Sequence, residues 1–168
     1  MSVALADFYT AIASAWDDSG LDVTFQALWG SDVVADNFQV LHDQEASPGQ
    51  PLPYCVLDQI TSSSIVSRMS ADGYSVREIR DIPVKFNVYA KEVTNDDRSA
   101  KAIAAYLVEE LMKVFGGHPT VSPTGTLTLS NGNHLITQYQ TDYGVRLEDG
   151  EHQWIVSYIF RLDVPVAV

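Results

Sequence analysis

The sequence contains one cysteine, few basic residues and no long apolar run. Cys55 alone excludes an internal disulfide and a multi-cysteine zinc site. Ten lysines and arginines stand against 22 aspartates and glutamates, a formal net charge of −12, whereas a protein that binds nucleic acid in a sequence-specific way needs a basic face. No apolar stretch approaches the roughly 20 residues of a membrane-spanning helix. The N-terminus carries Asp7 and no basic leader, so we expect a soluble intracellular protein without a secretory signal or a membrane partner.

Motifs for catalysis and for cofactor or metal binding are also absent from the sequence. No His-Glu-x-x-His or Cys/His spacing joins the four histidines, no glycine-rich phosphate cradle is present, and no Gly-x-Ser-x-Gly elbow holds a serine. Cys55 lies in the apolar run PYCVL without a basic cluster beside it, which favours a small buried hydrophobic residue over a reactive thiol. We therefore predict no catalytic residue, no cofactor and no metal, and a protein that is not an enzyme.

Two segments have the apolar periodicity of amphipathic helices. In the first, apolar residues recur at spacings of three and four before Gly20, which we expect to end the helix: Leu5, Phe8, Ile12 and Trp16. In the second, the spacing is four and two glycines follow: Ile103, Leu107, Leu111 and Phe115.

Other segments indicate strands, separated by turn and loop signals rich in glycine, proline, asparagine and aspartate. The predicted strands are 22–25, 54–60, 82–90, 126–130, 134–143 and 153–166. Helices and strands in this order predict one α+β domain over residues 1–168, with a mostly antiparallel sheet and two main helices on one face. Its core should include Phe86, Val88, Leu107, Leu111, Trp154, Val156 and Phe160.

The serine-rich segment 61–80 predicts a long β-hairpin that protrudes from the domain, with Asp72-Gly73 as its turn. Ile65, Val66 and Met69 interrupt its polar composition, and such apolar side chains are costly to leave in solvent. We predict that the hairpin contacts a neighbouring subunit. The candidate interface residues are Ile65, Val66, Arg68, Met69, Arg77 and Arg80, with Glu148, Asp149 and Glu151 as possible acidic partners on the next subunit.

Three polar residues in a row, Asn95, Asp96 and Asp97, follow the strand predicted at 82–90. Carboxylates at such a place are compatible with a metal-dependent active site and also with an ordinary helix start. A catalytic or metal site needs converging partners, such as a histidine four residues further on, and none is present. We therefore predict a helix cap, in which the Thr94 hydroxyl accepts a hydrogen bond from a first-turn amide and Asp97 reaches back to the Thr94 amide.

The segment 153–166 is apolar on both of its faces. One face carries aromatic residues and the other isoleucines: Trp154, Tyr158 and Phe160 against Ile155 and Ile159. A strand covered on both faces is either central in the sheet of a monomer or in contact with another subunit. The sequence leaves both interpretations open.

The order of these segments resembles that of the tail terminator, or neck, proteins of long-tailed bacteriophages. PYCVLDQI is similar to a Pro-Tyr-Val-Val-Leu run frequent there, and a long hairpin then leads into IPVKFNVYAK. The short connection EVTNDD precedes the helix RSAKAIAAYLVEELMKVF, and YIFRLDVPV forms the closing strand. The resemblance covers most of the chain from about residue 50, while 21–50 has no counterpart and 117–145 is long for the family.

The resemblance implies a structural subunit of a phage or prophage tail or neck, in a homo-oligomeric ring, commonly a hexamer, that terminates the tail tube and joins it to the head. The implied partners are other copies of the chain, the tail-tube protein and the head-completion protein. The implied location is the virion tail or neck, assembled in the bacterial host cytoplasm. A net charge of −12 suits a ring through which DNA passes, because its lumen should repel phosphates.

Two alternatives stand beside this interpretation. The nearer one is another phage structural subunit, either a head-completion stopper or a tail-tube protein. The more distant one is a small-molecule-binding domain or an enzyme on a similar α+β scaffold. A closed apolar pocket with converging polar groups would favour the second, and a concentration-dependent ring would favour the phage subunit.

Overall fold

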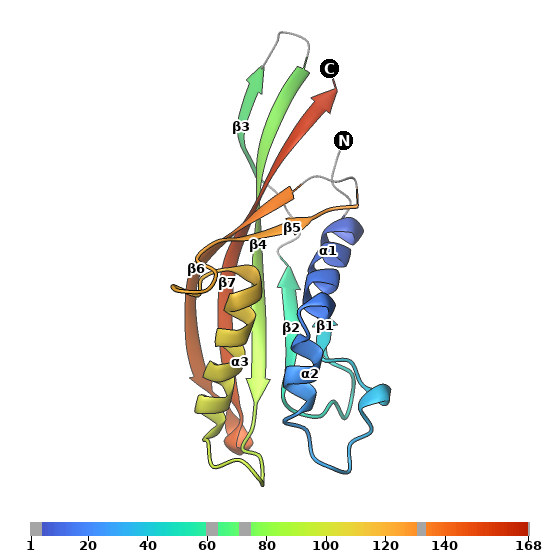
Figure 1. Cartoon of the computed structure of the whole chain (residues 1–168), viewed down its shortest axis with the longest axis vertical. Coiled ribbons are helices and arrows are strands. Elements are labelled where there is room, and N and C mark those ends of the chain that lie inside the picture. The colour runs from blue at the N-terminus through green and yellow to red at the C-terminus, as the bar shows by residue number, and fades with distance from the viewer. Residues whose placement is uncertain (1–4, 60–63, 71–74, 131–133, 168) are drawn as a thin grey trace.

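Two long strands form the axis of the molecule, and helices pack against one end of them (Figure 1). The computed structural model describes residues 5–59, 64–70, 75–130 and 134–167. The described strands form a seven-stranded sheet in the order β1-β2-β4-β7-β6-β5, with β3 also paired to β4. The strands are β1 (Leu41–Asp43), β2 (Tyr54–Gln59), β3 (Ser64–Ser70), β4 (Ser75–Ala90), β5 (Gly125–Thr128), β6 (His134–Arg146) and β7 (His152–Ala167). β1 and β2 pair in parallel and the other pairs are antiparallel, so the predicted α+β class with a mostly antiparallel sheet is confirmed.

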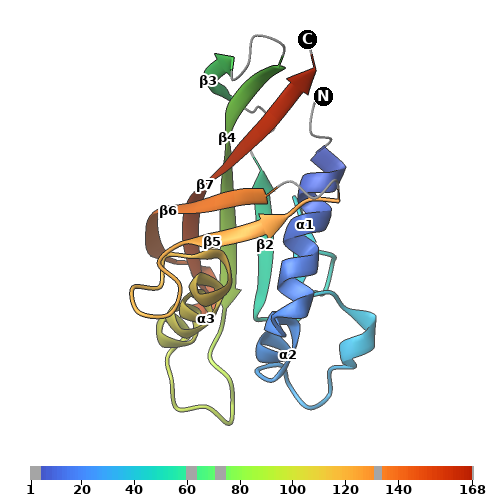
Figure 2. The same ribbon diagram turned by 45° about the horizontal axis from the view of Figure 1, so that its top comes forward.

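The three described α-helices lie on one face of the sheet (Figures 1 and 2). They are α1 (Leu5–Asp18), α2 (Leu21–Gln26) and α3 (Ala100–Phe115), and two short 3-10 helices, η1 (Ala35–Asn37) and η2 (Glu148–Gly150), lie in the connections. The sheet curls at a register shift in β6 between Tyr139 and Thr141. Figure 2 shows that β5 crosses in front of the sheet to reach α1, which it contacts.

The strand predicted at 22–25 is wrong, because these residues form α2. Gly20 has a φ of 75°, in the left-handed region, and this turns the chain between α1 and α2. Leu21 and Phe25 are then four residues apart on a helix, and both are buried against the core. Four residues of sequence are too few to show this helical period, so tertiary burial determines the element.

The core lies between the helices and the inner face of the sheet. Phe86 of β4 is fully buried and contacts the rings of Trp16, Phe115 and Tyr158, with ring centroids 6.5, 4.8 and 5.8 Å away. Of the seven predicted core residues six are buried: Phe86, Val88, Leu107, Leu111, Val156 and Phe160. Trp154 is the exception and is only half-buried, because it lies at the rim of the helix layer, where its indole nitrogen bonds to a carboxylate.

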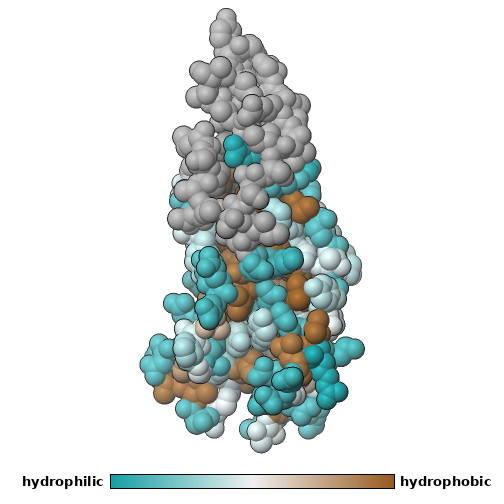
Figure 3. Space-filling view, turned by 180° about the vertical axis from the view of Figure 1, so that it is seen from behind, coloured by the Kyte–Doolittle hydropathy of each residue, from teal (hydrophilic) through white to brown (hydrophobic). Residues whose placement is uncertain are grey.

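The strand β7 lies between β4 and β6, so the apolar segment 153–166 is a central strand over most of its length. Its inner face is covered by the helices. No described helix covers the outer face, and Figure 3 shows apolar and polar side chains intermixed on that side of the molecule. Ile155 and Ile159 on that face are partly exposed. The segment is thus a central strand of the chain's own sheet, and contact of its uncovered outer face with another subunit stays a prediction.

Candidate assembly surfaces

The far end of the sheet projects beyond the helices (Figure 1). We call this part the arm, and it consists of β3 with residues 75–81 of β4 and 161–167 of β7. The predicted hairpin pairing is confirmed, since β3 pairs antiparallel with β4 from Ser64 opposite Asp81 to Ser70 opposite Val76. Its predicted turn, Asp72-Gly73, lies outside the described residues. At the base of the arm, the Arg161 guanidinium bonds both oxygens of Asp81 at 2.8 and 2.9 Å, which ties β7 to β4.

The arm has two strand edges without a partner among the described strands. On one side, β3 pairs with β4 alone. On the other side, the pairing of β6 with β7 ends at Leu162, so β7 from Asp163 to Ala167 pairs with β4 alone. Backbone N–H and C=O groups at an open edge are a template for pairing with another chain. The sequence predicted an interface on the β3 side and left open whether the last strand contacts another subunit. Pro165 is a signal for an open edge in that strand, since proline in a strand is confined to edges and bulges.

The candidate interface residues lie at the two ends of the molecule. Five of them are paired across the hairpin: Met69 faces Arg77, Ile65 faces Arg80, and Arg68 faces Glu78, while Val66 lies at the bulge between Ile65 and Ser67. The three acidic candidates lie in and beside η2, at the turn between β6 and β7: Glu148, Asp149 and Glu151.

The two sets cannot meet within one chain. They are separated by the length of β7, which spans roughly 50 Å at about 3.3 Å per residue. Contact between the arm of one copy and the acidic turn of the next stays a prediction.

The helix cap differs from the prediction. α3 begins at Ala100, and the Ser99 hydroxyl caps it by accepting a hydrogen bond from the Ala102 N–H at 3.2 Å. Thr94 and Asp97 lie before the helix, so the predicted cap is wrong. Two hydroxyl residues, Thr94 and Ser99, precede the apolar stripe of α3. Contact of that stripe with the sheet decides which of the two stands at the helix start.

The carboxylate of Asp96 has a structural partner. Its oxygens accept hydrogen bonds from the Arg98 guanidinium, the shortest at 2.6 Å, and from the Arg98 backbone N–H at 2.9 Å. These bonds lower the pKa of Asp96 to about 2. Asp96 thus closes a local turn before α3, and within the described residues no group of histidines, cysteines and carboxylates could hold a metal ion.

Cys55 is fully buried in β2, and burial raises the pKa of its thiol well above the ordinary value. It is a core residue, as predicted.

On the outer face of the sheet, the Gln153 side-chain amide donates to the Asn87 side chain at 3.2 Å and to the Tyr89 hydroxyl at 3.1 Å. The Tyr89 ring stacks on Tyr54 with centroids 5.0 Å apart. This face is therefore ordered by its own contacts. No described helix is long and apolar enough to cross a membrane.

No protein-family model matches this chain, and no curated protein matches it. Among solved structures it is similar to a chain in the virion of a native gene transfer agent particle, with 15% identity and a TM-score of 0.43 over 75% of this chain and 80% of that chain. A second solved structure, which bears no descriptive name, has 14% identity and a TM-score of 0.48 over 96% of both chains. At these values neither similarity assigns a family or a function.

Proposed function

We propose that the chain is a structural subunit of a phage or prophage tail or neck, which assembles with copies of itself into a ring that terminates the tail tube and joins it to the head. The observation that carries the proposal is the arm, a projecting sheet with an open edge on each side. The segments behind the family resemblance support it, because they form β2, β4, α3 and β7 in the expected order.

The two open edges of the arm favour a ring over a dimer. If β3 of one copy meets the end of β7 of the next, the contact joins two different surfaces, and the assembled pair as a whole retains one free β3 edge and one free β7 edge. Such a head-to-tail contact continues until the ring closes. Pairing of like edges would instead satisfy each contact within a two-fold dimer.

The charge of the chain is compatible with DNA passing through such a ring. A net charge of −12 per copy favours a lumen that repels the phosphates of DNA in transit. The ring therefore needs no sequence-specific contact with DNA. Its protein partners under this proposal are the tail-tube protein and the head-completion protein.

Negative-stain electron microscopy with sedimentation velocity tests the proposal. We expect rings whose abundance rises with protein concentration, and rings capping the ends of purified tail tubes. A stopper would instead be found on heads, and a tube protein would polymerise into filaments. A chain that stays monomeric at high concentration, with and without tubes, would contradict all three structural roles and would favour the small-molecule-binding alternative.

A further inference from the structure

A hollow of about 480 Å³ lies between α3 and the β6–β7 pair, away from the arm. Its floor is aliphatic, formed by Val108 and Met112 of α3, and the Trp154 indole forms one wall. Two carboxylates, Glu109 and Asp142, reach its lining. The proposed ring contacts use neither the hollow nor these residues.

The aromatic wall is held in place by hydrogen bonds and by a glycine. The Trp154 indole N–H donates to one oxygen of Asp142 at 2.7 Å, and the Tyr139 hydroxyl donates to the other oxygen. Gly144 faces Trp154 across the strand pair, and a Cβ at this position would lie 2.9 Å from the indole ring and 2.6 Å from the His152 Nε2. Residue 144 therefore has no room for a side chain, and the indole occupies that space.

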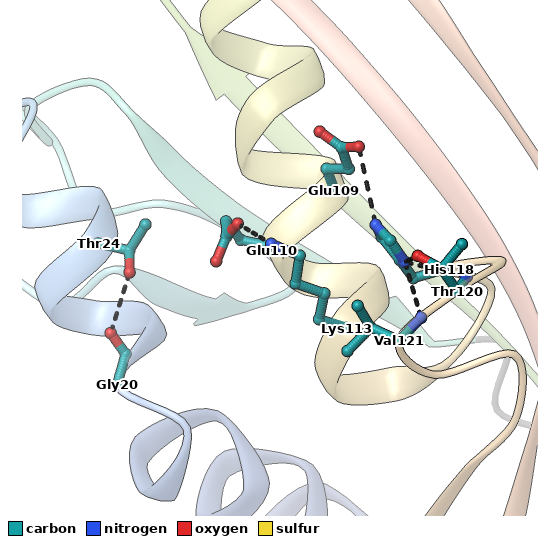
Figure 4. A network of polar contacts seen from close by, with 8 residues as sticks. All are labelled: Gly20, Thr24, Glu109, Glu110, Lys113, His118, Thr120 and Val121. Carbon is teal, nitrogen blue, oxygen red and sulfur yellow. Dashed lines mark hydrogen bonds and ion pairs between the residues drawn. The ribbon is translucent and has the colours of Figure 1, made fainter.

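Glu109 and Asp142 form what we call the acidic rim of the hollow. The Glu109 side chain is held in place as well (Figure 4). The Nδ1 atom of His118 accepts a hydrogen bond from the Val121 N–H at 3.1 Å, so the proton of the neutral ring is on Nε2. That Nε2 lies 3.7 Å from a Glu109 carboxylate oxygen and directs this side chain to the rim. In Figure 4, Lys113 points along α3 to Glu110, with which it pairs at 2.6 Å, rather than to Glu109.

The hollow thus combines two carboxylates with an indole and an aliphatic floor, and no described lysine or arginine forms an ion pair with Glu109 or Asp142. This combination matches an arginine side chain. Its aliphatic stem would lie on Val108 and Met112, its planar guanidinium would stack on the indole, and its N–H groups would bond the carboxylates. Lysine has the charge without the planar group and is the poorer match.

We propose that this hollow binds an arginine side chain presented by a partner protein. The inference is independent of the proposed ring, because it depends only on residues of the hollow. A blocked arginine represents a residue within a chain. Free arginine would add an α-ammonium and a carboxylate that a residue within a chain lacks, so the blocked form is the probe.

The test is a titration with N-acetyl-arginine-N-methylamide, followed by two-dimensional NMR of the tryptophan indole N–H groups. The chain has three tryptophans, and two serve as internal controls because their indoles are buried and donate to Asp22 and to the Pro53 carbonyl: Trp16 and Trp29. We expect a saturable shift of the Trp154 signal alone. The blocked lysine should need a higher concentration for the same shift.

Variants test whether binding depends on the two carboxylates of the hollow or on the net negative charge of the chain. Asp142→Asn and Glu109→Gln should each weaken binding about tenfold or more, because each removes a charged hydrogen-bond acceptor. Glu110→Gln, one residue away on α3 and paired outside the hollow, should leave binding unchanged. If Asp142→Asn itself disturbs the Trp154 signal, Glu109→Gln decides the question. A non-saturable shift, equal shifts of all three indoles, equal binding of blocked lysine, or full binding by Glu109→Gln would overturn the proposal.

Discussion

At the residue scale, α3 is capped by a different side chain from the one that the local motif predicts. Ser99 accepts the first-turn hydrogen bond that the S/T-x-x-D/E pattern at Thr94 and Asp97 predicts five residues earlier. Ser99 and Thr94 are both exposed, so a substitution at either position leaves the core unchanged, and only the one at Ser99 removes the cap.

We expect Ser99→Ala to lower the free energy of unfolding by about 0.5–2 kcal/mol, because the Ala102 N–H loses its acceptor. Thr94→Ala is the matched control and should change stability by less than about 0.5 kcal/mol. Urea denaturation followed by circular dichroism measures both. A larger loss for Thr94→Ala than for Ser99→Ala would contradict the assigned cap.

The Asp96–Arg98 pair predicts a pH dependence. The pKa of Asp96 is lowered to about 2 by its bonds to Arg98, below the ordinary value of about 3.9. A lowered carboxylate pKa stabilises the fold above about pH 4, and this contribution is lost as the pH falls toward 2. The stability difference between the wild type and Asp96→Asn should therefore shrink between pH 5 and pH 2. The neighbouring Asp97→Asn, which removes no described ion pair, is the matched control.

At the scale of elements, the packing of α3 on β4 and β7 is the main stabilising contact of the helix layer. Ile103, Leu107, Leu111 and Phe115 are all fully buried, as their spacing of four predicts. Leu111→Ala should lower the free energy of unfolding by about 2–5 kcal/mol, through lost burial and a residual cavity. Val121→Ala, at a side chain that is 62% exposed, should stay within about 0.5 kcal/mol. Denaturant titrations compare the two, and a small loss for Leu111→Ala would show that the helix does not pack as described.

The arm is the element whose behaviour should depend on assembly. The amides of β3 and of residues 163, 164, 166 and 167 lie on strands with one partner each, so we expect them to exchange quickly in the monomer and slowly in the ring. Residues 84–89 of β4 have partners on both sides and should be protected in both states. Hydrogen exchange read by mass spectrometry makes the comparison. Equal protection of the arm in monomer and ring would remove its role as a contact element.

For the whole molecule, the separation of charges between its two ends predicts how copies associate. Arg68 is in the arm and Glu148 is in the turn at the opposite end. If the arm of one copy meets the acidic turn of the next, a contact that is an alternative to pairing of β3 with β7, Arg68→Glu should shift sedimentation profiles toward the monomer, because it places like charges across that contact. Adding Glu148→Arg to that variant should restore the larger species. Lys101→Glu, at an exposed cation on α3, should have no effect. Failure of the double variant to recover would exclude this pair while leaving edge pairing open.

Local sequence patterns determined much of the fold. The alternation Val84, Phe86, Val88 and Ala90 fixes which face of β4 is buried, because side chains on a strand alternate between its two faces. The spacing of four in α3 fixes its buried stripe in the same way. The composition alone determined the net charge of −12 and the lack of cysteine pairs.

Tertiary structure decided the features that depend on residues far apart in the chain. Leu21 and Phe25 form a helix because the core covers them, and Ser99 caps α3 because the apolar stripe sets where the helix starts. The open edge of β7 exists because β6 stops pairing at Leu162, a limit that depends on another strand and that the sequence of β7 signals only through Pro165. Glu109, Asp142 and Trp154 line one hollow because α3 packs on the β6–β7 pair, which brings together residues far apart in the chain. Periodicity reports which side of an element is apolar, whereas partners and cavities arise only when separate elements pack together.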